Sequence, residues 1–441
     1  MFEGKPRELF VRFAIPQMIG LLFNSVYTIV DGVFIGHRLG REAMAAAAVA
    51  VPLIEILISV AIAVAAGAGV LIAARLGSGK GSEARRLFNT AAWMTGAAGL
   101  GVALLGNLYL EPLALLLGAA PEVLPQAMAY LWYIVAFAPF QLFSFLLGGM
   151  ARNDGRPKLA MTAMIAGAVS NIVLDYVFMY PLDLGIQGAA LATALGPIFS
   201  VLILLPHFLL RRGTLYFQAV RPRLPEGRSI LVCGAPSFLM EFSIGIVTFL
   251  YNVAVSHHGY GELGLAAYLM IGYLMLILLT LFLGMAEGLQ PVFSRFMATG
   301  EGERNRAMGR FSAKVFLGVG MVSCLLIFLG SQWFFLLFAP EDPELTAFAA
   351  SRSIPYFCGF FLTGFNILMI SFLQATRQTG KAMVLSLLRS VILPPALLLL
   401  LPVFLGREAV WVCQSAADAL TALFAICSLA FPSWACYSKL R

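Results

Sequence analysis

The sequence predicts an all-α polytopic membrane protein with twelve transmembrane helices in two pseudo-symmetric six-helix lobes. Of the 441 residues, 60% are hydrophobic and only 12% are charged, which is about half the charged fraction of a soluble domain. Apolar runs of about 20 residues, the length that crosses the hydrocarbon core as a helix, recur along the whole chain. The second half of the chain also repeats features of the first half.

Charged residues, glycines and prolines divide the chain into twelve predicted spans. Because no water satisfies backbone groups inside a bilayer, these runs must be helices, since barrel strands would be shorter and would alternate in polarity. We expect the first span to be retained, because the opening MFEGKPRELF lacks the features of a secretory signal. The approximate limits are residues 11–36, 44–74, 88–110, 124–149, 159–180, 188–210, 230–255, 263–293, 312–337, 345–371, 382–404 and 408–433.

Basic residues gather on one side of the predicted membrane. With the N-terminus in the cytoplasm, 24 of the 29 Lys and Arg residues lie at cytoplasmic connections or span ends. The outer connections hold only Arg38, Arg41 and Arg407. This bias predicts that both termini are cytoplasmic. The net charge of +7 therefore reflects topology, and we expect membrane lipids rather than nucleic acid as partners.

An internal repeat divides the chain into two halves. A shift of 220 residues superimposes Pro16 on Pro236 and Arg75 on Arg295. Each half holds an even number of spans, so the repeats share one orientation and are related by an axis near the membrane normal. Carriers that bind substrate between two halves have this organisation. The predicted units are an N-terminal lobe at 1–210, a basic cytoplasmic linker at 211–229 and a C-terminal lobe at 230–441.

An aspartate lies late in the first span, in the stretch YTIVDGVFIG. On insertion scales, a charged side chain at the bilayer centre costs about 2.5–3.5 kcal/mol, so Asp31 is expected to have a function. Gly20, Asn24, Tyr27 and Asp31 follow one another at steps of four, three and four, which places them on one helix face. This polar face should look into the protein or into a wet cavity.

The fifth and sixth spans offer partners for Asp31. Asn171 and Asp175 share a face of the fifth span, and Thr193 follows in the small-residue run GIQGAALATALG. An Asn or Ser would be enough to link helices, whereas two carboxylates that face one cavity are suited to binding protons or a cation. Under the 220-residue shift Tyr251 replaces Asp31, and the counterpart of Asp175 is apolar. We therefore place the ion site in the first lobe.

Other charged residues also fall inside the spans. Glu241, deep in the seventh span, is a candidate substrate or proton carboxylate of the second lobe. Glu287 lies towards a helix end, where it could line a cavity or reach the interface. Six acids and two arginines lie inside the spans, and this excess of negative charge favours cationic cargo. Besides Asp31, Asp175, Glu241 and Glu287, these residues are Glu55, Asp418, Arg352 and Arg389. We expect the two arginines to snorkel to the interface or to pair with an acid.

Several other functions are not supported by the sequence. The six cysteines form no CxxC pair and are expected to be free thiols, and no metal site is expected beyond a possible Na⁺ site. The stretch GSGKGS at 77–82 lacks the spacing of a phosphate-binding loop, which argues against ATP use. We expect no cofactor.

Three motifs occur at characteristic places along the chain. Pro16 and Asp31 form P-(x)14-D in the first span, followed by IGHRLG. Asn171 and Asp175 precede LGIQGAALAT, which delivers Thr193, and EGLQPVFSR (287–295) follows the eighth span. Together, in this order and with this topology, they resemble the multidrug and toxic compound extrusion (MATE) family, nearest its DinF-like and MepA-like members. The resemblance covers essentially the whole chain.

The resemblance implies a multidrug efflux antiporter rather than an enzyme. It would export amphiphilic, often cationic compounds against an inward flow of H⁺ or Na⁺ by alternating access, as a monomer in the cell membrane of a bacterium or archaeon. The tenth span contains no acid, so the pattern of members with a second-half sodium site is incomplete. The resemblance implies Asp31, Asn171, Asp175 and Thr193 for the coupling ion and Pro16 for a helix bend. From the residues themselves, we expect Tyr27, Asn24, Glu241 and Glu287 at the substrate cavity.

Two alternatives remain open at this point. The chain could flip a lipid-linked precursor, a role that would favour a strongly cationic cavity. It could instead be an intramembrane aspartyl enzyme built on Asp31 and Asp175, although no GxGD motif is present. The duplicated halves weigh against a purely structural or receptor role.

Overall fold

A computed structural model describes residues 3–119, 121, 123–219, 222–336 and 342–430, and these contain helices but no strand. The helices of the first half are α1 (Pro6–Gly77), α2 (Gly81–Leu108), α3 (Leu110–Leu116), α4 (Leu124–Ala136), α5 (Ala138–Asn153), α6 (Pro157–Met179) and α7 (Gly185–Leu209). Those of the second half are α8 (Leu224–His257), α9 (Gly261–Ala298), α10 (Gly302–Leu336), α11 (Pro343–Phe357), α12 (Phe360–Ala375), α13 (Thr379–Leu387), the π-helical turn η1 (Leu388–Ile392), α14 (Leu393–Leu405), the 3₁₀ segment η2 (Arg407–Val412) and α15 (Cys413–Ala430).

The predicted transmembrane spans are confirmed. Within the described residues, ten stretches are long and apolar enough to cross a membrane. Two further spans are broken helix pairs: α4 and α5 meet at a bend of 45°, and α11 and α12 at a bend of 47°. Counting each pair as one span gives the expected twelve. The sequence did not predict either break.

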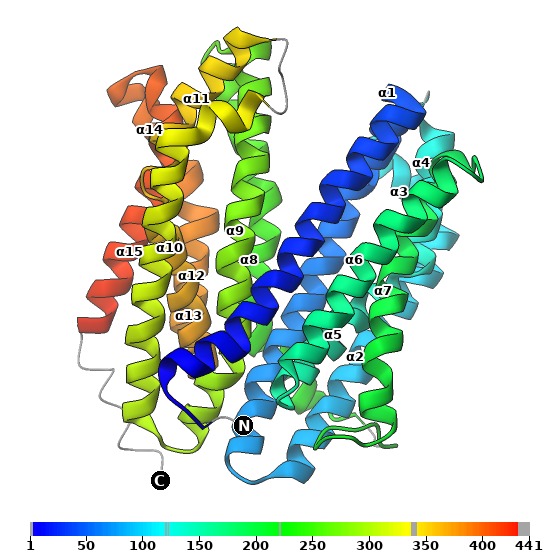
Figure 1. Cartoon of the computed structure of the whole chain (residues 1–441), viewed down its shortest axis with the longest axis vertical. Helices are drawn as coiled ribbons and strands as arrows, with labels where there is room; N and C mark the ends of the chain where they lie inside the picture. The colour runs from blue at the N-terminus through cyan, green and yellow to red at the C-terminus, as the bar shows by residue number, and fades with distance from the viewer. Residues whose placement is uncertain (1–2, 120, 122, 220–221, 337–341, 431–441) are drawn as a thin grey trace.

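The first two spans belong to one continuous helical run. At 1.5 Å per residue, a straight helix of the 72 residues of α1 would be about 110 Å long, far more than a bilayer needs. The run instead holds two membrane-crossing stretches, Pro6–Leu39 and Ala46–Gly77. In Figure 1 the dark-blue ribbon rises from the N-terminal end and a lighter blue ribbon returns. The two predicted spans are therefore present without an irregular loop between them.

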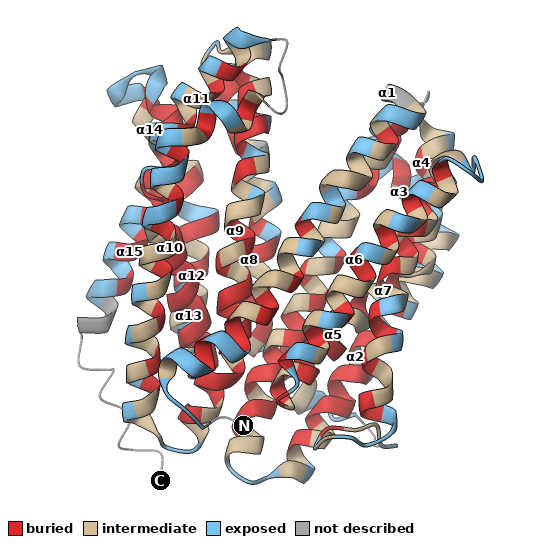
Figure 2. Ribbon diagram, in the orientation of Figure 1, coloured by how far each residue is buried: buried red, intermediate tan, exposed pale blue. Residues whose placement is uncertain are grey.

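The helices form two bundles, which we call the first bundle (α1–α7) and the second bundle (α8–α15). Figure 1 shows that the bundles converge at the lower end of the view and diverge towards the upper end. Figure 2 shows many buried residues in the lower region, where the bundles meet. The connections after α1, α5 and α9 also lie at this lower end, and nine of the 18 predicted cytoplasmic arginines lie in or beside them.

Each bundle receives the start of the other bundle's first helix. Phe10 and Phe13 of α1 belong to the hydrophobic core of the second bundle. Ile230, at the start of α8, belongs to a core of the first bundle. Phe10 and Ile230 are 220 residues apart, the same separation as the sequence repeat. The two bundles are therefore crossed at the lower end in a pseudo-symmetric way.

Glycines allow the crossed helices to touch backbone to backbone. A Cβ atom on Gly234 of α8 would lie 1.9 Å from the carbonyl oxygen of Ala63, and one on Gly67 would lie 2.0 Å from that of Ile230. On the other side of the crossing, a Cβ on Gly288 of α9 would lie 2.4 Å from the carbonyl oxygen of Phe13. Small residues are what close helix approach in a membrane requires.

The connection between the bundles is fastened to the first bundle. Asn89 of α2 accepts a hydrogen bond from the backbone N–H of Gln218 (2.8 Å) and donates to the carbonyl of Tyr216 (3.1 Å). Asp154 accepts from the backbone N–H of Thr214 (2.9 Å), and its carboxylate lies 2.8 Å from His207 Nε2. These contacts give an irregular stretch of backbone the partners that it needs outside the lipid.

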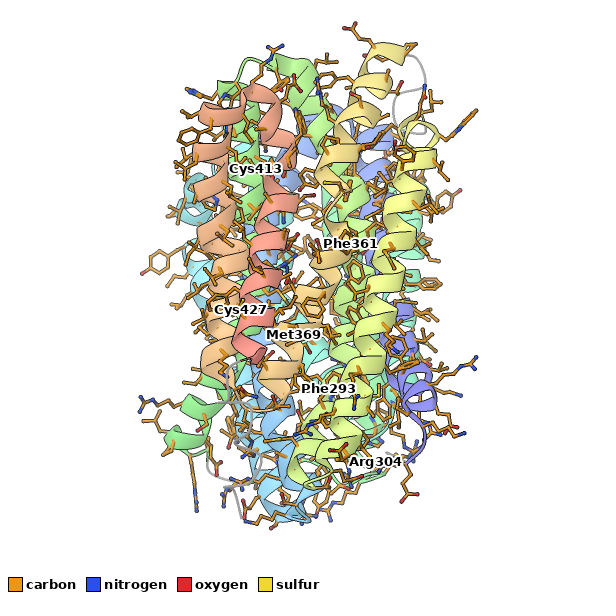
Figure 3. All side chains as sticks on the ribbon, turned by 90° about the vertical axis from the view of Figure 1, so that its left-hand side faces the viewer. Phe293, Arg304, Phe361, Met369, Cys413 and Cys427 are labelled. Atoms are coloured by element: carbon orange, nitrogen blue, oxygen red, sulfur yellow. The ribbon has the colours of Figure 1, made fainter. Side chains whose placement is uncertain are left out.

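The surface of the second bundle is suited to lipid. Figure 3 shows mostly carbon atoms along the middle of the bundle, whereas nitrogen and oxygen atoms gather towards its ends, where Arg304 lies. Trp333, Leu399 and Phe404 are each more than 70% exposed. Apolar side chains exposed to this extent over a whole face are expected where hydrocarbon rather than water is the solvent.

Substitution of Gly67 by Ala tests the close helix crossing. The new methyl group meets a carbonyl oxygen of another helix, which no side-chain rotation relieves, so we expect a loss of about 1–3 kcal/mol of stability. Thermal unfolding of the purified protein in detergent measures it. Gly101→Ala is the control, because a Cβ there has no neighbour within 4 Å. Equal melting temperatures for both variants would contradict the crossing.

Candidate functional site

A cavity lies between the two bundles, above their crossing. Its empty space, part of which is open to solvent, measures about 1200 Å³, and side chains of α1, α5, α6, α7, α8, α9 and α12 line it. Most of the lining is apolar or small. Its charged and amide-bearing members are Gln17, Asn24, Gln141, Arg152, Asn153, Asn171, Glu241, Glu287, Gln290 and Gln374.

Two aspartates meet beside the cavity. The carboxyl groups of Asp31 on α1 and Asp175 on α6 lie within hydrogen-bonding range of each other. Asp175 is fully buried, and neither residue is among those that line the cavity. The Oδ1 atom of each carboxyl group is buried, and no donor of the described residues reaches either atom. Two adjacent carboxylates whose Oδ1 atoms have no donor among the described residues need a proton or a cation between them.

Asn171 and Thr193 connect this carboxyl pair to the cavity wall. Both residues line the cavity. With its amide oriented to satisfy both groups, Asn171 donates to Asp175 Oδ2 (3.2 Å) and accepts from the backbone N–H of Thr193 (3.2 Å). The hydroxyl oxygen of Thr193 is buried, and none of the described residues hydrogen-bonds to it. The predicted set of Asp31, Asn171, Asp175 and Thr193 is therefore brought together.

Two tyrosines complete the surroundings of the carboxyl pair. Tyr27, one turn before Asp31, lines the cavity close to both carboxyl groups, as the helix-face pattern predicted. Tyr130 of α4 lies beside Thr193 and close to both aspartates, and it is only 3% exposed. Sequence reasoning missed Tyr130. Its span carries polar residues at helical spacing (Gln126, Tyr130, Gln141 and Ser144), and this pattern could have suggested it.

The remaining predicted cavity residues line the cavity as well. Asn24 faces it from α1, between Gly20 and the carboxyl pair. Glu241 of α8 is 8% exposed, and none of the described residues hydrogen-bonds to its carboxyl group. Glu287 of α9 accepts a hydrogen bond from Gln17 Nε2 at 2.7 Å, so it faces the cavity instead of reaching the interface. Pro16 lies inside the helical run of α1, where a missing N–H weakens the helix.

The other interior charges lie away from the cavity lining. Arg389 pairs with Asp418 at 3.1 Å in the second bundle, and both side chains are almost fully buried. Arg352 pairs with Glu408, so both arginines have an acidic partner, one of the two arrangements expected for them. Glu55 is partly buried in the second span and does not line the cavity. Among the described residues, no group of three or more His, Cys, Asp or Glu side chains is arranged to hold a metal.

Comparisons with known proteins decide the family. The MatE family model matches the chain twice, over residues 16–177 and 236–398. The chain belongs to the MatE family. It is a transporter of the MepA-like branch and not an enzyme, and the helices described above make it a multi-pass membrane protein.

Individual relatives match along almost the whole chain. The multidrug export protein MepA of Staphylococcus aureus (strain bovine RF122 / ET3-1) is 26% identical over 431 residues, which is 96% of this chain and 94% of the relative. An outward-facing structure of a multidrug resistance MATE family transporter has a TM-score of 0.90 at 24% identity, covering 97% of this chain and 96% of that chain. A transporter of the MOP superfamily from Pyrococcus furiosus gives the same values, and its pocket is described as having reversed polarity. These likenesses support the fold.

The contact between the two aspartates predicts a pH-dependent effect of Asp31→Asn. The new amide can donate to Asp175, so in Na⁺-free buffer at about pH 10, where the wild-type pair no longer keeps a shared proton, we expect a gain of roughly 1 kcal/mol in stability. At pH 5 the wild-type carboxyl groups can share a proton, so the gain should shrink. Melting temperatures of the two proteins across this pH range measure it. A difference that stays constant with pH would contradict the contact.

Proposed function

We propose that the protein is a multidrug efflux antiporter that exports lipophilic cations against an inward flow of H⁺ or Na⁺. The carboxyl pair of Asp31 and Asp175 is the observation that carries this proposal. Two buried carboxyl groups whose Oδ1 atoms have no donor form a site for a positive ion, and the site adjoins a cavity that both bundles line. An ion and a cargo molecule can therefore influence each other over a short distance.

The cavity supports cationic, amphiphilic cargo. Glu241 and Glu287 face it against a single arginine, Arg152, and the rest of the lining is mostly apolar or uncharged. A lipid-linked precursor with anionic phosphates would favour the opposite charge balance, so this lining argues against the flippase alternative. The similarity to MepA, a multidrug export protein, supports drug molecules as cargo. No cofactor enters the proposed cycle.

The residues around the carboxyl pair fit either coupling ion. The carboxyl oxygens of Asp31 and Asp175, the hydroxyl of Thr193 and the amide oxygen of Asn171 are the hard oxygen ligands that a small cation prefers. The same two carboxyl groups could instead take up protons. Both versions neutralise the pair, and both involve side chains that the structure brings together.

Competition between ion and cargo would couple their movements. When the pair is ionised, its negative charge favours a cation in the cavity; when H⁺ or Na⁺ enters from outside, that attraction is lost and cargo leaves. Thermodynamic linkage requires each ligand to weaken the other by the same factor. We propose that the first helix bends near Pro16 as the occupancy of Asp31 changes, because proline removes one hydrogen bond of the helix there.

We further propose the arrangement of the chain in the membrane. The two lobes would be residues 1–210 and 230–441, joined by a linker at 211–229, and both termini would face the cytoplasm of a bacterial cell. The double family match, which begins 220 residues apart, supports the lobes. The basic connections support the orientation, and the diverging ends of the bundles in Figure 1 would then face outwards. We expect a monomer to be the working unit.

Asp31→Asn is expected to abolish gradient-driven efflux while the protein still folds. The variant keeps the shape of the side chain but removes the charge that competes for cargo. Efflux of a fluorescent cation from membrane vesicles, with a pH gradient or a Na⁺ gradient imposed separately, measures the loss and identifies the ion. Asp183→Asn is the matched control, because Asp183 is exposed and paired with Arg38. Full coupled transport by Asp31→Asn would rule out the assignment.

Glu241→Gln is expected to weaken the binding of cations selectively. A carboxylate in the cavity adds a charge-assisted contact worth about 1.5–3 kcal/mol, so affinity for ethidium should fall by roughly tenfold or more. Affinity for a neutral lipophilic dye of similar size should change little. Fluorescence titration of the purified protein compares the two dyes. An equal loss for both would show that Glu241 supports only the shape of the cavity.

A further inference from the structure

One arginine faces the cavity that we assign to cationic cargo. Arg152 lies near the end of α5, and its side chain is 12% exposed. Its Nη1 atom donates to Gln17 Oε1 at 2.8 Å, and its Nη2 atom lies 3.6 Å from Glu287 Oε2. Gln17 in turn donates to the same Glu287 oxygen at 2.7 Å. The three side chains form a closed triangle, which we call the floor triad.

The floor triad joins the two bundles. Arg152 and Gln17 belong to the first bundle and Glu287 belongs to the second, on the helix whose Gly288 contacts the backbone of Phe13. The triad thus adjoins the crossing at the lower end of the molecule (Figure 1). A separation of the bundles at this end would break the contacts that Glu287 makes with both partners.

The guanidinium group of Arg152 lies beside two glycines of its own helix. A Cβ atom on Gly149 would lie 3.7 Å from Nη2, and one on Gly148 would lie 4.0 Å from Nη1. The side chain therefore folds back over a glycine surface towards Glu287. An arginine that merely reached the aqueous interface would extend away from the cavity.

Glu241, the other carboxylate that lines the cavity, lies outside the floor triad. Glu241 has no hydrogen-bonding partner among the described residues, although it is close enough to Glu287 for their charges to interact. The cavity therefore presents two carboxylates, one free and one that already holds a cation. A guanidinium on a carboxylate is chemically the same contact that a cationic drug would make.

We propose that Arg152 is a built-in cation that occupies Glu287 while the cavity is empty and that cationic cargo displaces. The proposal rests on the export of cations proposed above and names the residue that sets selectivity within that cavity. Cargo first meets Glu241 and then competes with Arg152 for Glu287. Because Arg152 and cargo compete for Glu287, the return of Arg152 to Glu287 favours the release of cargo and restores a contact between the bundles at the closed end.

A double-mutant cycle tests the competition directly. Fluorescence titration with ethidium compares the wild type, Arg152→Gln, Glu287→Gln and the double variant, all as purified full-length protein. Releasing Glu287 from Arg152 should tighten ethidium binding by about tenfold, the factor that corresponds to about 1.4 kcal/mol. Glu287→Gln should weaken binding. In the Glu287→Gln background, Arg152→Gln should then have no further effect, because no carboxylate is left to compete for.

The controls separate competition from a general field effect. If Arg152 acts only by repelling cations, Arg152→Gln tightens binding equally with and without Glu287, and the proposal is wrong. An unchanged affinity in Arg152→Gln would overturn it as well. Arg38→Gln removes a positive charge outside the cavity and should leave the affinity as it is. A neutral dye, bound equally by all variants, checks that the cavity is intact.

A second variant keeps the proposal testable if Arg152→Gln does not fold. Arg152→Lys retains the charge but lacks the planar fork that reaches Gln17 and Glu287 together, so binding should tighten by a smaller factor. A lysine variant that binds ethidium no more tightly than wild type would count against the proposal. If the wild type binds no cation at all, both the proposed function and this inference fail. If the wild type binds ethidium but the effects of Arg152→Gln and Glu287→Gln on affinity simply add, only this inference is overturned.

Discussion

The contact between Asp31 and Asp175 is the constraint on which the rest of the site depends. Two carboxyl groups buried side by side cannot both remain ionised without a compensating positive charge, because the low-dielectric surroundings strengthen their repulsion. The structure places no basic side chain beside them, and the Oδ1 atoms have no donor among the described residues. We propose that this positive charge is supplied by an ion that enters and leaves. Such an exchange would couple the first bundle to an ion gradient.

The crossing of the bundles connects the carboxyl pair to parts of the structure that would move when the bundles shift. The starts of α1 and α8 lie in each other's bundle core, and glycines allow their neighbours to touch backbone to backbone. Asp31 and Phe13 lie on the same helix, so a change at the carboxyl pair acts on an element that is anchored in the second bundle. The floor triad lies between these two points. Pro16 lies between Phe13 and Asp31 on α1, and a proline inside a helix favours a bend there.

The fold and much of the site followed from local patterns. Hydropathy and length predicted the twelve spans, because hydrocarbon leaves a chain few ways to satisfy its backbone. The four-residue spacing of Asn171 and Asp175 predicted one polar face. The sequence did not predict the bend between α4 and α5. Pro139 lies near this bend, but Pro52 lies in a similar apolar run without breaking its helix, so a proline alone does not identify a break. The floor triad and Tyr130 depend on which helices become neighbours, and spacing along one helix carries no such information.

The most direct test of the central claim measures cargo affinity against ion concentration. Ethidium binding to the purified wild-type protein is titrated at several pH values without Na⁺, and at several Na⁺ concentrations at one pH with choline replacing Na⁺. Ethidium affinity should fall as the concentration of the coupling ion rises, and the double variant Asp31→Asn/Asp175→Asn should show no such dependence. An affinity that is unaffected by both ions, or a dependence that persists unchanged in the double variant, would contradict it.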